Sequence, residues 1–350
     1  DVSTLAMNDQ FGVSVALNAA GDRLAVGAIG DNGANSDVTP SGAVYLISFD
    51  DGDFTGGTVA GIVGADYAGP KDINVLPLSF SDQFGVSVAL NGAGDRLAVG
   101  AITDGGSGDT TAASGAVYLF SFSDDDFSGG VHTGTAGKGY AGASDVNLSA
   151  LEAADQIGRG IALNNAGDRL AIGAVGDAGN GNGTAAAGAV YLISFADGSF
   201  SNGTLTATLG KGYAGGNNLD VSSLGSTDQF GTALAMNGAG NLLAIGAPGD
   251  SGASNRSSTS GAVYLLRFED TNFYGGKLVG IIGDGYQQMA DIALNAGPDT
   301  AEQFGISAAL NGAGNRLAVG AFGDKGAGDT LSNGGAVYLF SFSDDQFSDG

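Results

Sequence analysis

The sequence predicts an all-β fold, a β-propeller of five four-stranded antiparallel blades in which the last blade lacks its fourth strand. Three observations carry this prediction. A block of about 73 residues recurs along the whole chain, each copy holds four short apolar strand patterns, and no stretch shows helical periodicity. Repeats of this kind favour one blade per copy.

Two recurring words set the period. Phe11-Gly12 and the tetrad GAVY at Gly42 both return at steps of 73, 73, 73 and 74 residues, except that Ile157 replaces Phe in the third copy. We therefore predict a single propeller domain over residues 1–350. Its repeats span about 1–73, 74–146, 147–219, 220–293 and 294–350. The one added residue is expected in a connecting loop between Tyr286 and Gln303.

Each strand of the first copy follows from its local pattern. Residues 11–18 alternate large and small side chains, residues 24–28 follow after a short Gly-containing turn, and residues 42–49 alternate again after a Gly-rich loop. A fourth strand is expected near residues 58–63, followed by a polar connector that contains Tyr67. A linear stack of sheets stays open as the main alternative, while a β-helix fits poorly because its coils are shorter. Whether five blades close a ring is also left open.

Composition excludes several function classes. The 350 residues carry a net charge of −25, with 65 Gly, no Cys and one His. This charge argues against nucleic acid and against anionic membranes as partners. The lack of Cys excludes disulfides, and no apolar run approaches the ~18 residues of a membrane span, so no membrane insertion is expected. No signal peptide is seen and Asp1 starts inside the repeat pattern, so we expect a mature or trimmed chain.

The repeated words resemble those of FG-GAP repeats. They are FG at the head of the first strand, GA at the end of the second (once Gly246-Ala247-Pro248), and GAVYLF in the third. This family includes the propeller heads of integrin α chains and many bacterial surface and secreted proteins. The resemblance implies a propeller fold and an extracellular or cell-surface location. Integrin-like repeats often carry a calcium loop of the form DxDxDGxxD between the first two strands. Here the matching turn, residues 18–22, offers at most one carboxylate, so that calcium site is not carried over.

Acidic residues recur at three positions of the repeat. The first set precedes Gln at the head of the first strand: Asp9, Asp82, Asp155, Asp228 and Glu302. The second set follows the GA word: Asp31, Asp104, Asp177, Asp250 and Asp324. The third set lies in the pattern F-x-D-x-x-F: Asp51, Asp124, Asp197, Asp270 and Asp344.

Each acidic set has a turn-fixing interpretation, in which the carboxylate accepts backbone N–H groups. The alternatives are an axial ring of carboxylates that binds a cation for the first set, and a metal site in the long loop for the second. For the third set we expect the two flanking Phe rings to pack the hairpin onto the next blade. The acidic turns at residues 50–53 and 123–126 are weaker calcium candidates.

From its sequence, the protein is not expected to be an enzyme. The single histidine, His132, lies in a segment that the other copies do not match, and zinc ligands and phosphate-binding loops are lacking. Glu152 is an unmatched acid, but one carboxylate makes no mechanism.

Two functions remain. The first is a non-catalytic extracellular or cell-surface repeat protein with a structural or adhesive role. It would require no cofactor and would self-associate or form a filament through the open edge of the last blade. The alternative is a ligand-binding propeller that recognises a glycan or a protein, with Ca²⁺ as an optional aid.

Overall fold

The structure is a computed structural model. It describes residues 2, 4–34, 40–76, 78–253, 259–287, 291–294, 301–326, 331, 333–344 and 346–350. The chain divides into two compact units. The first comprises Asp1–Asp168 and Phe195–Thr204, and the second comprises Arg169–Ser194 and Leu205–Gly350. The boundary runs through the third repeat.

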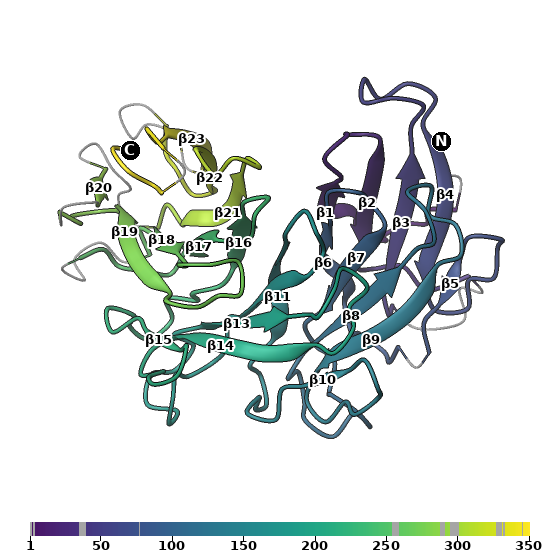
Figure 1. Cartoon of the computed structure of the whole chain (residues 1–350), viewed down its shortest axis with the longest axis horizontal. Helices are drawn as coiled ribbons and strands as arrows, with labels where there is room; N and C mark the ends of the chain where they lie inside the picture. The colour runs from purple at the N-terminus through teal and green to yellow at the C-terminus, as the bar shows by residue number, and fades with distance from the viewer. Residues whose placement is uncertain are drawn as a thin grey trace. The chain divides into compact units, whose positions relative to one another are not determined.

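The described residues form five β-sheets, one per repeat, and no helix (Figure 1). The first sheet has the order β1-β2-β3-β4-β5, with β1 (Phe11–Leu17), β2 (Arg23–Ala28), β3 (Ala43–Ser48), β4 (Thr58–Gly64) and β5 (Ile73–Asn74). The second sheet is built in the same way from β6 (Phe84–Leu90), β7 (Arg96–Ala101), β8 (Ala116–Ser121), β9 (Val131–Gly137) and β10 (Val146–Asn147).

The later repeats follow the same plan. The third has β11 (Ile157–Leu163), β12 (Arg169–Ala174), β13 (Ala189–Ser194), β14 (Thr204–Gly210) and β15 (Leu219–Asp220). The fourth has β16 (Ala233–Met236), β17 (Leu242–Ala247), β18 (Ala262–Arg267), β19 (Lys277–Gly283) and β20 (Ile292–Ala293). The fifth sheet contains β21 (Phe304–Leu310), β22 (Arg316–Ala321) and β23 (Ala336–Ser341).

The fold class predicted from the sequence, an all-β β-propeller of five blades with a final blade that lacks the fourth strand, is confirmed. One detail of the prediction was wrong, because the first four sheets have five strands. The added strand is only two residues long and lies in the connector. It runs parallel to the fourth strand, as in the pairing of Val63 with Ile73. A parallel pair has no hairpin signature, so the sequence pattern missed it.

The connecting loops were only partly described. In the Gly-rich loop expected between the second and third strands, residues 35–39 lie outside the described part of the chain. In the connector with the added residue, residues 288–290 and 295–300 lie outside it.

The core of each unit lies between the sheets of successive repeats. In the first unit, Val44 and Leu46 of β3 pack in one buried cluster with Phe84 of β6 and Phe120 of β8. In the second unit, Val263 of β18 shares a cluster with Phe304 of β21 and Val319 of β22. Apolar side chains in these clusters are removed from water, which stabilises the packing of one blade on the next.

Candidate functional site

The first acidic set closes the turn that leads into the first strand of each repeat. Its five members are buried, with exposed fractions of 3 to 7%. In four of them, carboxylate Oδ2 accepts a hydrogen bond from the backbone N–H three residues earlier, at 2.6–2.7 Å. The pairs are Asp9 with Ala6, Asp82 with Ser79, Asp155 with Glu152 and Asp228 with Gly225. These acids fix the turn; the axial cation site stays a prediction.

The second acidic set is the centre of a buried hydrogen-bond network in each repeat. Carboxylate Oδ1 accepts the N–H of the glycine two residues later, at 2.6–2.8 Å. The tyrosine of the GAVY word donates its hydroxyl to the same carboxylate at 2.7–2.9 Å. In the first four repeats the connector tyrosine donates a second hydroxyl at 2.8–3.1 Å. The aspartates are Asp31, Asp104, Asp177, Asp250 and Asp324, and the connector tyrosines are Tyr67, Tyr140, Tyr213 and Tyr286.

This tyrosine network was missed from the sequence, although a signal for it exists. Both tyrosines recur at fixed separations from the aspartate, 14 and 36 residues later. Because a buried carboxylate needs donors, two tyrosines at constant offsets from a recurring aspartate indicate such a network. Burial also raises the pKa of the hydroxyl of Tyr45, to about 12, so this side chain remains a donor at neutral pH.

The structure brings the first and second acidic sets together within a repeat. Burial raises the pKa of Asp82 to about 7, and the nearby carboxylate of Asp104 acts in the same direction. In the fourth repeat, burial raises the pKa of Asp228 to about 6, again with a contribution from Asp250. The sequence pattern by itself had indicated two separate sites. Among the described residues, no group of three or more His, Asp or Glu side chains is arranged to hold a metal ion.

These raised pKa values predict how stability depends on pH. The pKa of Asp82 in the folded chain is above its ordinary value of 3.8, so the folded state favours the protonated form. The stability that this preference contributes is complete below about pH 4, and it is lost as pH rises through about 7. Asp82→Asn keeps an acceptor for Ser79 N–H but carries no charge. We expect this variant to gain on the order of 4 kcal/mol over the wild type between pH 4 and pH 8.

Urea unfolding at several pH values measures this effect. A constant difference between Asp82→Asn and the wild type across that range would contradict the burial of an ionisable Asp82.

The third acidic set fixes the hairpin turn between the third and fourth strands. Asp124, for example, accepts the N–H groups of Asp126 and Ser128, both at 3.0 Å. The flanking rings pack edge to face, with centroids 4.9–5.2 Å apart in all five repeats. In the second repeat both rings belong to the cluster that contains Val44 and Leu46. The hairpin therefore packs onto the preceding repeat, and the expectation that it packs onto the next blade was wrong.

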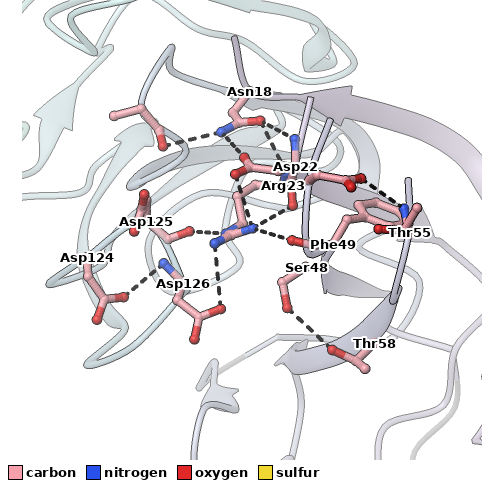
Figure 2. Close-up of polar contacts among 12 residues, drawn as sticks. Asn18, Asp22, Arg23, Ser48, Phe49, Thr55, Thr58, Asp124, Asp125 and Asp126 are labelled. Carbon is pink, nitrogen blue, oxygen red and sulfur yellow. Dashed lines mark hydrogen bonds and ion pairs between the residues drawn. The ribbon is translucent and has the colours of Figure 1, made fainter. Parts of the chain in front are cut away.

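An arginine joins the turn of one blade to the second strand of the blade before it (Figure 2). Arg23 Nε donates to the carbonyl of Asp125, and Nη1 donates to the carbonyls of Asp22 at 2.7 Å and Phe49 at 3.1 Å. Arg96 and Arg169 make the matching contacts with Gly198 and Thr271. This role was not predicted, although Asp-Arg recurs after the first turn in three copies.

The turn at residues 18–22, which matches the calcium loop of integrin-like repeats, is closed by an amide side chain (Figure 2). Asn18 Oδ1 accepts the N–H groups of Asp22 and Arg23, both at 3.1 Å, and Asn18 Nδ2 donates to Asp22 Oδ1 at 2.8 Å. The single carboxylate of this turn is thus bonded within the turn itself.

Two glycines allow successive blades to approach closely. The FG glycine adopts a positive φ, +92° at Gly85 and +97° at Gly158, a backbone conformation that residues with a side chain rarely adopt. Its carbonyl oxygen lies against the glycine of the GA word in the preceding repeat. A Cβ atom on Gly27 or Gly100 would come within 3.0 Å of that oxygen. A serine of the preceding first strand also donates to it, as Ser14 Oγ does to Gly85 O at 2.7 Å.

A family comparison matches repeats that contain these glycine motifs. A family model described as "FG-GAP repeat" matches residues 3–47, 78–120 and 222–266. The matched residues lie in the first, second and fourth of the five repeats. The interlocked glycines are therefore the physical basis of the FG and GA words. FG-GAP repeats of this kind are typical of extracellular or surface proteins, and they indicate a ligand-binding or structural repeat protein.

Other comparisons add little to the FG-GAP assignment. The crystal structure of Saccharomyces cerevisiae Sqt1 aligns with a TM-score of 0.43 and 11% identity, over 96% of this chain. The chain spans 64% of the length of that protein. The comparison with curated proteins found no match. Among the described residues there is no helix long and apolar enough to cross a membrane.

Proposed function

We propose that this FG-GAP chain is a non-catalytic, extracellular or cell-surface repeat protein with a structural or adhesive role. The proposal rests on one observation: the repeated acids form hydrogen bonds within their own repeats. The second-set carboxylates receive hydroxyl and N–H donors from their own repeat, and the third set holds hairpin turns. Groups that recur five times and bind their own blade support architecture rather than catalysis.

Calcium dependence tests this proposal. We expect the melting temperature to be the same in millimolar calcium and in excess chelator, because the repeated carboxylates already have donors and need no ion. Differential scanning calorimetry in the two buffers measures it, with magnesium at equal ionic strength as the control for screening. A calcium-specific rise of several degrees would favour the calcium-assisted binding alternative.

Self-association belongs to the same proposal. On β23, Val337 and Leu339 are 69% and 81% exposed, and apolar side chains on a sheet favour contact with another chain. We expect Leu339→Lys to weaken self-association. Sedimentation velocity over a wide range of concentrations measures it, with Val59→Lys on the outer strand β4 as the control. A wild-type chain that stays monomeric throughout would count against an assembly role.

A further inference from the structure

The second repeat contains a cavity of about 430 Å³ whose lining differs from that of the corresponding cavity in the fourth repeat. Leu76, Asp82, Asp109, Tyr118, His132 and Tyr140 are among its lining residues, and no lysine or arginine is. The cavity belongs wholly to the first unit.

Two carboxylates in this cavity have at least one oxygen to which no described residue donates. Asp82 is 3% exposed, and its Oδ2 accepts Ser79 N–H, but its Oδ1 has no hydrogen-bond partner among the described residues. Asp109 is exposed at the rim, its carboxylate has no donor among the described residues, and it lies close enough to act electrostatically on Asp82. The buried side-chain oxygens without a partner do not include Asp82 Oδ1, so this oxygen is open to the cavity, where a ligand with donors can reach it.

Aromatic rings form another part of the lining. The ring centroids of Tyr118 and His132 are 5.5 Å apart, and those of Tyr118 and Tyr140 are 6.5 Å apart. His132 Nε2 lies 3.1 Å from both Gly134 O and Thr135 Oγ1. Burial lowers the pKa of His132, which favours the neutral ring.

The fourth repeat shows that the fold does not require this lining. Its corresponding cavity, of about 560 Å³, has Leu278 and Ile281 where the second repeat has His132 and Thr135. Asp228, the counterpart of Asp82, does not line it. The polar and aromatic lining of the second repeat is therefore a local feature added to a common blade.

We propose that the cavity of the second repeat binds an organic ammonium group, held by the carboxylates of Asp82 and Asp109 and by the rings of Tyr118, His132 and Tyr140. An ammonium group is a donor without acceptors, which matches carboxylates that lack donors. Aromatic faces attract such a cation. This binding role goes beyond the structural function proposed above and does not depend on it.

Other ligand classes fit less well. Calcium requires six to eight oxygen ligands, and the described residues offer no cluster of three or more acids arranged for a metal. A neutral sugar presents acceptors as well as donors, whereas the tyrosine hydroxyls of this cavity already donate to Asp104.

Titration calorimetry with methylammonium and tetramethylammonium chlorides tests the proposal at pH 8 and constant ionic strength. We expect saturable binding of at least one ammonium probe and none of tert-butanol, glucose or calcium. Asp82→Asn and Asp109→Asn should each weaken binding about tenfold or more. Asp228→Asn is the matched control, because it removes the equivalent turn-fixing carboxylate outside the cavity, and it should leave binding unchanged.

A second variant rebuilds the cavity as in the fourth repeat. His132→Leu with Thr135→Ile should fold, because the fourth repeat folds with those residues, and should lose binding. Binding should also weaken as pH falls from 8 to 5, as Asp82 is protonated. The other titratable groups around the cavity are Asp104, Asp109, Tyr118, His132, Tyr140 and Asp145.

Three results would overturn the proposal. They are no binding of either ammonium probe, equal losses in the Asp82 and Asp228 variants, and binding of glucose or calcium in place of ammonium.

Discussion

Gly100→Ala is expected to destabilise the chain by about 3 kcal/mol. A Cβ atom at this position would lie less than 3.0 Å from the carbonyl oxygen of Gly158. That oxygen belongs to the backbone of a strand in the next repeat, so it cannot rotate away as a side chain would. Overpacking a rigid interface commonly costs about 1–3 kcal/mol. We expect the upper end of that range here, because the backbone must move.

Gly320→Ala is the matched control for this prediction. It has the same place in the GA word, but an added Cβ would meet only the side chains of Ser307 and Ile306. We expect a loss of less than about 1 kcal/mol, because a side chain can change rotamer. Urea denaturation of both variants measures the difference. Equal losses would show that the local strand conformation, rather than the close approach of two blades, explains why this glycine recurs.

Asp104→Ala is expected to cost on the order of 4 kcal/mol. The substitution leaves three donors without an acceptor: the buried hydroxyl of Tyr118, the partly buried hydroxyl of Tyr140 and the N–H of Gly106. Each such group costs about 1–3 kcal/mol when it is left unsatisfied. The raised pKa of Asp104, which results mainly from burial, offsets part of this loss at neutral pH.

Two controls separate the network from the turn. Asp124→Ala removes a carboxylate of the exposed hairpin turn, and we expect a much smaller loss there. A double-mutant cycle between Asp104→Ala and the change of Tyr118 and Tyr140 to Phe should show strong coupling. Additive losses in that cycle would contradict a shared network. Chemical denaturation monitored by tyrosine fluorescence measures all of these variants.

The strand pattern was predictable because it depends on neighbours in the chain. Alternation of large and small residues identified the four main strands, and the register of 73 residues identified the blades. The turn-fixing interpretation of the acids also followed from local rules, and the structure shows it at Asp124 and at Asp82. The direction in which the Phe pair packs was mispredicted, because a hairpin pattern does not say which neighbour lies beneath it.

Sequence alone therefore determined the repeat number, the strand segments and the glycine words, since each rests on short-range backbone chemistry. Tertiary structure alone decided which groups meet. Asp104 receives hydroxyls from tyrosines 14 and 36 residues away, and Asp82 shares a cavity with His132, 50 residues later. Such long-range contacts depend on how the sheets and connectors pack against one another. The unmatched histidine thus looked incidental in the sequence, and only the folded blade places it in the lining of the same cavity as Asp82.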